Sequence, residues 1–286
     1  MKPVTKSRLF RLLQAPLLVY VGFCGLVGAC QRSLIYHPTR QSEAALMRDA
    51  RAERCVPWRD AGNAIIGWKS ARKAGEPAAP NRLVVFCGNA GSALDRAYYV
   101  RGFEHYAGGA RWEVYLFEYP GYGARNGRIS ESSFIDAGEK ALQALTAADS
   151  RPVYLLGESL GSGLACALAQ RQPAHVAGLF LLTPYARLGD VAAQQFRYLP
   201  ARLMLRDPWD NVTALRAYRG PVAMLIAGQD EVVTAAQGRL LYQGYAGPKH
   251  LWTDPDAGHN GIDFSASAPW WHEVSDFLLG DASRRL

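Results

Sequence analysis

A serine, an aspartate and a histidine occur in that order along the 286-residue chain, in contexts where they could perform nucleophilic catalysis. Ser159 lies in the sequence GESLG, with Gly157 two residues before it and Gly161 two residues after it. The residues VYLL before it predict a strand, and the residues GSGLACAL after it predict a helix. A serine on such a tight strand-to-helix turn presents its hydroxyl clear of the sheet, and the flanking glycines avoid side-chain collisions. The pattern therefore predicts that Ser159 is a nucleophile.

A serine nucleophile needs a general base and a group that orients the base. His259 lies in DAGHNG, directly after the last predicted strand, and Asp230 lies in GQDEVV, after the strand before it. Open α/β sheets place their sites at the carboxyl ends of the strands, so we expect both residues beside Ser159. Proteins with this kind of strand-to-helix turn have their catalytic residues in the same order along the chain: serine, acid, histidine.

Other histidines and acids fit less well. His250 lies inside a predicted strand and His272 in the last predicted helix, and the remaining histidines precede the acid or the serine: His37, His105 and His175. For the acid, the alternatives are Glu231, Asp190 and the two aspartates of the His259 loop, Asp254 and Asp256.

Acyl transfer also needs hydrogen-bond donors for the oxyanion. One expected donor is the backbone N–H of Leu160, the residue after the nucleophile. The other is expected in the loop CGNAGSALDR, which follows the predicted strand Arg82–Cys87. The backbone N–H of Asn89 is our first choice and that of Ala90 the second, with the Asn89 side chain bracing the loop.

The elements that must position these residues alternate between strand and helix. The predicted strands RLVVFC, WEVYLFEY, PVYLLG, VAGLFLLTP, PVAMLIAG and KHLWTD are separated mostly by helical segments. This order predicts a parallel sheet with right-handed crossovers and helices on both faces. RCVPWRD and AIIGWKS are expected to form a hairpin before it, after a short connector, QRSLIYHPTRQSEAALM. Residues 185–220 predict a small helical cap, in which Tyr185, Phe196 and Leu199 line a pocket or form cap core.

The first 29 residues predict a signal peptide or a membrane anchor, followed by a single domain over residues 30–286. A basic segment containing Lys2, Lys6, Arg8 and Arg11 precedes an apolar run that ends in LVGAC. The run after Pro16 is expected to be too short for a comfortable membrane span. Its end resembles a bacterial lipobox, in which Cys30 would carry lipid. An uncleaved anchor and a plain cleaved signal are the alternatives.

Composition excludes several other classes of protein. Hydrophobic residues make up 49% and charged residues 20% of the chain, which is typical of a globular protein. The net charge of +7 comes largely from the N-terminus and does not indicate nucleic-acid binding. Cys55, Cys87 and Cys166 are an odd set without a CxxC pair, which argues against a disulfide framework or a structural zinc site. The sequence implies no metal and no organic cofactor.

Together these motifs resemble the α/β-hydrolase superfamily. They are similar to a small-cap subgroup with an HGNAG-type oxyanion loop, a GYG loop, a Gly-x-Ser-Leu-Gly turn and a GHN histidine loop. The matching ranges are Gly88–Gly91, Gly121–Gly123, Gly157–Gly161 and Gly258–Asn260. Two positions depart from the subgroup, since Cys87 replaces its usual histidine and Gly261 its common aspartate.

The resemblance implies an α/β-hydrolase fold, with a mostly parallel central sheet, helices on both faces and a small helical cap. It implies a serine hydrolase of small-molecule or lipid acyl esters that forms an acyl-enzyme. Acyl-thioesters and lysophospholipids are the alternative substrates; a serine peptidase or a non-catalytic binding module fits less well. The N-terminus predicts attachment to a membrane of the bacterial cell envelope, with the domain facing the periplasm or the exterior.

Overall fold

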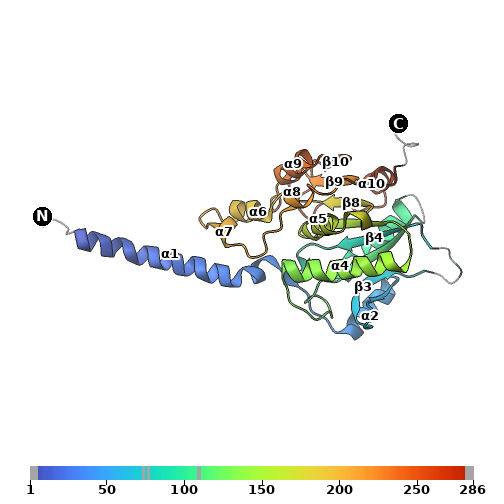
Figure 1. Cartoon of the computed structure of the whole chain (residues 1–286), viewed down its shortest axis with the longest axis horizontal. Helices are drawn as coiled ribbons and strands as arrows, with labels where there is room; N and C mark the ends of the chain where they lie inside the picture. The colour runs from blue at the N-terminus through green and yellow to red at the C-terminus, as the bar shows by residue number, and fades with distance from the viewer. Residues whose placement is uncertain (1–5, 73–74, 76–77, 108–110, 281–286) are drawn as a thin grey trace.

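An eight-stranded sheet forms the centre of the computed structural model, which describes residues 6–72, 75, 78–107 and 111–280, with side chains from residue 14 onward. The strands lie in the order β10-β9-β8-β7-β4-β6-β3-β2. Their bounds are β2 Cys55–Arg59, β3 Ile65–Ser70, β4 Asn81–Phe86, β6 Trp112–Phe117, β7 Val153–Glu158, β8 Gly178–Leu182, β9 Val222–Ala227 and β10 Lys249–Asp254. Figure 1 shows this sheet with helices around it and one long helix projecting to the N-terminus.

Strand direction follows the pattern of the sequence. β4 and β6 to β10 pair in parallel, and every residue of β4, β6, β8 and β9 is buried, as expected for strands covered on both faces. β2 and β3 pair antiparallel, which confirms the expected hairpin. The α/β-hydrolase fold with a mostly parallel sheet is therefore confirmed.

The main helices connect the strands. They are α3 Tyr98–Arg101, α4 Glu131–Ala148, α5 Gly161–Arg171, α9 Ala235–Gly244 and α10 Trp270–Leu279. Ser130 caps α4 by accepting a hydrogen bond from the N–H of Ser133 (3.2 Å). Gly138 lets α4 approach the leucines of α5 closely. α10 is tied to β6, because the indole of Trp112 donates to the Ser275 hydroxyl (2.8 Å).

The segment expected to be a connector is structured, and that expectation is wrong. It contains β1 (His37–Pro38), which pairs in parallel with β5 (Ala90–Gly91), and it leads into α2 (Glu43–Ala52). Ser42 caps α2, and the helix buries Leu46 and Ala50. The sequence SEAALMRDA thus begins with a typical cap followed by good helix formers.

The cap lies within the expected range. It contains α6 (Leu188–Gln195), α7 (Ala201–Met204) and α8 (Asn211–Ala214), between β8 and β9. α8 packs on α5, whereas α6 and α7 extend toward the long N-terminal helix (Figure 1).

That N-terminal helix, α1, spans Lys6–Ile35. It continues without a break through Cys30, whereas the sequence suggested a boundary there; Lys2 lies outside the described residues. The stretch Gln14–Ile35 is long and apolar enough to cross a membrane by length and composition, so the apolar run is longer than expected. A signal sequence would meet the same criterion.

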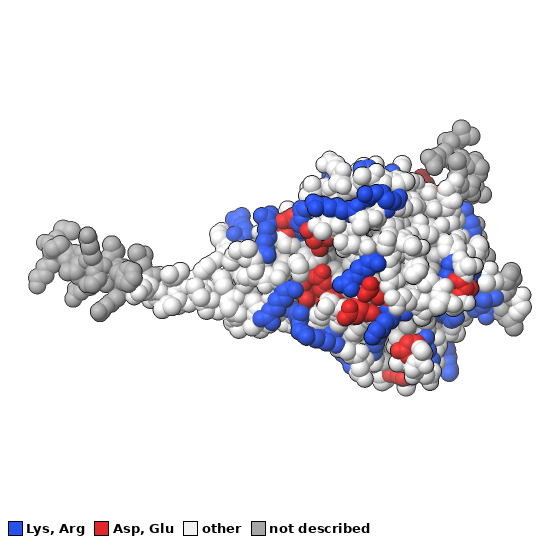
Figure 2. Space-filling view, in the orientation of Figure 1, with Lys and Arg blue, Asp and Glu red and all other residues white. Residues whose placement is uncertain are grey.

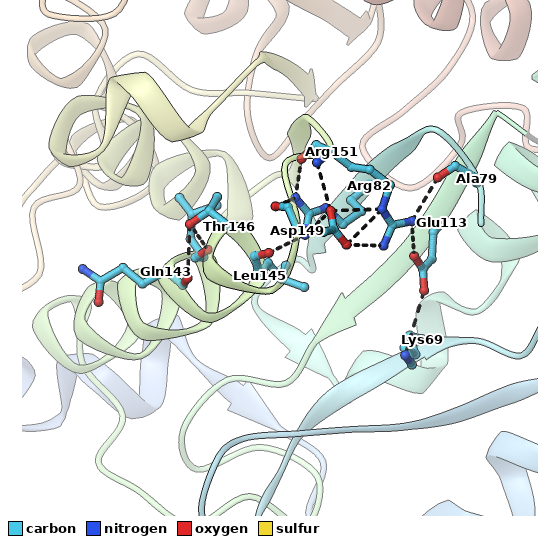
Figure 3. A network of polar contacts seen from close by, with 10 residues as sticks. Lys69, Ala79, Arg82, Glu113, Gln143, Leu145, Thr146, Asp149 and Arg151 are labelled. Atoms are coloured by element: carbon cyan, nitrogen blue, oxygen red, sulfur yellow. Dashed lines mark hydrogen bonds and ion pairs between the residues drawn. The ribbon is translucent and has the colours of Figure 1, made fainter.

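The amino-terminal edge of the sheet is held by a polar network around a buried arginine (Figure 3). The Arg82 side chain is 1% exposed and donates to the carbonyl oxygens of Leu145 and Arg151. The guanidinium of Arg151 reaches back to Glu113 (2.7 Å) and to Asp149 (2.8 Å). These contacts fix the turn between α4 and β7, and so fix where β7 begins.

Candidate active site

Ser159 lies on a strained turn between β7 and α5. Its φ angle is +50°, in the left-handed region, and its N–H donates to the carbonyl oxygen of Leu182 in β8 (2.9 Å). A Cβ atom at Gly157 would lie 2.6 Å from the carbonyl oxygen of Gly161, and one at Gly161 would collide with the carbonyl oxygen of Phe86. The two glycines are therefore required by close backbone contacts on either side of the serine.

The three side chains predicted for catalysis form one hydrogen-bonded chain. Ser159 Oγ lies 2.9 Å from His259 Nε2, and His259 Nδ1 lies 2.7 Å from Asp230 Oδ2. The other oxygen of Asp230 accepts the N–H groups of Val232 (2.9 Å) and Val233 (2.7 Å). Asp230 is thus held by the turn after β9, and His259 is presented by the loop after β10. The arrangement leaves Nε2 of His259 to receive the serine proton when Nδ1 carries the other proton.

The alternative acids and histidines have other surroundings. Asp190 forms an ion pair with Arg202 in the cap (2.7 Å). His250 packs on the ring of Trp252 within β10, and His272 is exposed on α10.

The loop after β4 lies beside the serine, as expected for an oxyanion loop. β4 pairs with β7 so that Phe86 is opposite Gly157, and a Cβ atom at Gly88 would lie 3.9 Å from that of Ser159. The Asn89 amide donates to the carbonyl oxygen of Ile35 (2.9 Å), so this side chain braces the loop. Leu160 directly precedes α5, so its backbone N–H lies at the N-terminal end of that helix, next to Ser159.

A cavity of about 280 Å³ opens at the serine and histidine. Its lining residues are Arg96, Tyr98, Glu158, Ser159, Leu182, Thr183, His259, Asn260, Ile262 and Phe264. A larger hollow of about 550 Å³, lined in part by Asp149 and His175, lies at the other edge of the sheet. We place the site at the smaller cavity because ligands of open α/β sheets bind at the carboxyl ends of the strands.

The three cap residues considered as pocket lining lie elsewhere. Phe196 and Leu199 line a separate apolar cavity of about 70 Å³ between the cap and α1. Tyr185 is buried, and its hydroxyl lies 3.4 Å from the carbonyl oxygen of Leu160. Of the two alternatives for these residues, Tyr185 belongs to the core, and Phe196 and Leu199 line the cavity beside α1 and not the one at Ser159.

Sequence reasoning missed a charged group next to the nucleophile. Glu158 accepts hydrogen bonds from the Arg96 guanidinium (3.0 Å) and from the hydroxyls of Tyr98 (3.2 Å) and Tyr99 (3.0 Å). Burial alone would lower the pKa of Arg96, but the carboxylate of Glu158 outweighs burial and raises it. Burial raises the pKa of both tyrosines, so their hydroxyls stay neutral donors. This cluster ties the segment after the oxyanion loop to the residue before Ser159; the only signal in the sequence was a glutamate ending an apolar strand.

Cys87, at the position where the resembled subgroup has histidine, is a buried thiol. Burial raises its pKa, so the thiol stays protonated at neutral pH. Its carbonyl oxygen accepts the hydroxyl of Tyr119 (2.6 Å). The residue therefore packs behind the oxyanion loop and has no nucleophilic character.

Comparison with known proteins agrees with this architecture. Residues 80–214 match the family model for the alpha/beta hydrolase fold. The chain is 30% identical over 249 residues to an uncharacterized protein of Mycobacterium tuberculosis, covering 85% of each chain. It is 26% identical to alpha/beta hydrolase domain-containing protein 17C of Homo sapiens, covering 54% of this chain and 46% of that one.

Solved structures of esterases share the fold. An esterase of Pyrococcus furiosus superposes with a TM-score of 0.63 at 17% identity, covering 86% of this chain and 97% of that one. The esterase domain of a Rhodothermus marinus protein gives a TM-score of 0.55 at 15% identity, covering 77% and 95%. The sequence relatives, the family model and the sheet topology lead to one conclusion: the chain belongs to the alpha/beta hydrolase fold family.

Proposed function

We propose that this chain is a serine hydrolase that cleaves acyl esters through an acyl-enzyme. The observation that carries the proposal is the hydrogen-bonded chain Ser159–His259–Asp230, which borders a cavity at the carboxyl edge of the sheet. An alpha/beta hydrolase fold with esterases among its structural neighbours supports hydrolase activity in general. A serine nucleophile, a histidine base and an orienting acid in hydrogen-bond contact support acyl transfer through an acyl-enzyme.

The proposed reaction uses only side chains and backbone of this chain. Ser159 Oγ attacks the ester carbonyl while His259 Nε2 takes the hydroxyl proton, and Asp230 stabilises the imidazolium. The N–H groups of Leu160 and Asn89 bind the oxyanion of the tetrahedral intermediate. His259 then protonates the departing alcohol. A water molecule, deprotonated by His259, attacks the acyl-enzyme, and His259 returns this proton to Ser159 Oγ as the acid leaves.

Cavity size favours a small substrate. The volume of about 280 Å³ is just below the roughly 300–1,000 Å³ usual for small-molecule sites. A carboxylesterase acting on short acyl groups is therefore the first candidate. An acyl-thioesterase or lysophospholipase is the second, and the apolar helix α1 favours it because such substrates occur at membranes.

Labelling with a fluorophosphonate and a hydrolysis panel test the proposal. We expect the probe to label the wild-type chain and not a Ser159→Ala variant. Across p-nitrophenyl esters of increasing chain length, we expect turnover to be fastest for the shortest acyl groups, with an acyl-thioester included for the second candidate. Undiminished labelling of Ser159→Ala, or no hydrolysis of any substrate by a folded protein, would contradict it.

We also propose that the N-terminal segment attaches the protein to a bacterial membrane, with the domain in the periplasm or outside the cell. The basic residues at the start of the chain favour the cytoplasmic side for that end. Cys30 is exposed on α1 and is the proposed lipidation site, with cleavage separating residues 1–29 from 30–286. Labelling with a clickable fatty acid should be lost in Cys30→Ser; unchanged labelling and membrane association would favour an uncleaved anchor instead.

A further inference from the structure

Hydrogen bonds hold the cap against α1 at two places along the helix, near Tyr20 and near Gln31. The Tyr20 hydroxyl donates to the carbonyl oxygen of Tyr198 (2.7 Å). Further along the helix, the Gln31 amide donates to the carbonyl oxygen of Met204 (2.9 Å), and Gln31 Oε1 accepts the N–H of Arg206 (2.7 Å). Figure 1 shows α6 and α7 extending beside the C-terminal half of α1. The position of the cap along the helix is therefore set at two levels.

The exposed apolar surface of the molecule is concentrated on these same two elements. In the cap, Leu203 is 89% exposed and Tyr198 is 79% exposed, with Phe196 half exposed. On α1, the exposed large apolar side chains are Leu17, Leu18, Val19, Tyr20, Val21, Phe23, Leu26 and Leu34. In the rest of the described chain, only Val56, Val232 and Leu240 are of this kind. An apolar surface gathered at one end of a molecule marks an interaction site.

Helix geometry shows what covers this surface. Residues 12–31, between Arg11 and Arg32, include no charged residue. As a helix, with a rise of 1.5 Å per residue, they extend over about 30 Å, which is the thickness of the hydrocarbon core of a bilayer. Figure 2 shows the narrow stalk without charge and the first charged side chains where it widens into the domain. Tyr20 lies 12 residues before Arg32, roughly 18 Å along the helix axis.

We propose that the tip of the cap, residues 196–203, is embedded in the hydrocarbon core of the membrane that α1 crosses. This proposal rests on the membrane attachment proposed above in its uncleaved form, in which α1 stays part of the chain. A helix that spans the bilayer between Arg11 and Arg32 carries Tyr198 to the level of Tyr20, inside the hydrocarbon. Arg197 and Arg202 lie at this tip, and each charge has a partner within the cap. Arg197 stacks on the Tyr198 ring, and Arg202 forms an ion pair with Asp190.

Fluorescence quenching of the full chain in vesicles of phosphatidylethanolamine and phosphatidylglycerol tests the proposal. The background is Cys24→Ser/Cys30→Ser, which removes the two cysteines that are not buried and the proposed lipidation site. A single cysteine carrying an NBD dye replaces Leu18 on α1, Leu203 on the cap or Leu240 on α9. Leu240 is the matched control, because it is an exposed leucine outside both apolar elements.

We expect a nitroxide on the lipid acyl chain to quench the dyes at positions 18 and 203 severalfold more than the dye at position 240, and aqueous iodide to show the reverse. If position 18 is quenched by the lipid and position 203 behaves like position 240, the embedded cap is wrong and the anchor stands. If position 18 also behaves like position 240, the anchor itself is wrong, and the embedded cap with it. Ester hydrolysis by the same samples reports that each variant is folded.

Discussion

Replacing Asp230 by asparagine tests the proposed mechanism because the surroundings dictate how the amide must lie. One carboxylate oxygen accepts two backbone N–H groups, from Val232 and Val233, and the other faces His259 Nδ1 at 2.7 Å. An asparagine must keep its oxygen toward the two N–H donors, so its NH2 group faces the imidazole. Nδ1 can then only accept, and the neutral ring carries its proton on Nε2. In that tautomer Nε2 cannot receive the Ser159 proton.

The expected loss follows from that change of tautomer. We expect kcat for a short p-nitrophenyl ester to fall about 10⁴-fold, as in other triads in which the wrong tautomer is imposed. This loss corresponds to roughly 5 kcal/mol of transition-state stabilisation. The melting temperature should change little, because the asparagine retains both hydrogen bonds to the backbone.

The measurement is steady-state turnover with thermal melts, and the matched control is Asp256→Asn in the loop that carries His259. We expect the control to retain near-wild-type turnover. A rate for Asp230→Asn within tenfold of wild type, or a larger loss for Asp256→Asn, would refute the assignment of the acid.

Three further perturbations give distinct outcomes. Ser159→Ala and His259→Ala should each reduce turnover by on the order of 10⁶, and the double variant should lose no more, since the pair acts as a unit; multiplied losses in the double variant would contradict this. Cys87→Trp should destabilise the protein by roughly 1–3 kcal/mol or more in denaturant unfolding, because the indole ring overpacks a buried site. Cys87→His should be tolerated, and Cys87→Ser should stay active. Burial raises the pKa of Glu118 from 4.5 to about 7, so the folded state binds the proton more tightly and stability falls as pH rises between these values. In Glu118→Gln, the free energy of unfolding should no longer fall by roughly 3 kcal/mol between about pH 5 and about pH 8. A pH dependence in the variant that matches wild type would show that Glu118 is not its source.

The sequence allowed two features to be predicted, the sheet and the proximity of Ser159, Asp230 and His259, because both depend on local patterns. Apolar runs of strand length recur between helical segments, and the turn around Ser159 has a short signature in which each glycine has a steric reason. The order serine, acid, histidine then left few choices. These features are set by neighbours in the chain, so a single sequence contains them.

What could not be predicted depends on contacts between distant segments. The ion pair of Arg96 with Glu158 joins residues 62 positions apart, and neither residue has a partner recognisable from its neighbours in sequence. The direction of the cap depends on hydrogen bonds to α1 from more than 170 positions away, so the sequence could not decide whether its residues line the pocket or form cap core. α2 was missed for a different reason: its cap and helix formers are local signals that were interpreted as a connector.

The join between α1 and the domain has a mechanical consequence. The carbonyl oxygen of Ile35, the last residue of α1, accepts a hydrogen bond from the side-chain amide of Asn89. Two residues later, the backbone N–H of His37 in β1 donates to the carbonyl oxygen of Asn89 (2.8 Å). The chain therefore passes from helix to sheet with no flexible linker between them. An uncleaved membrane anchor formed by α1 would therefore hold Ser159 at a fixed height and angle to the bilayer. The enzyme proposed here would then act only on substrates that diffuse to this height.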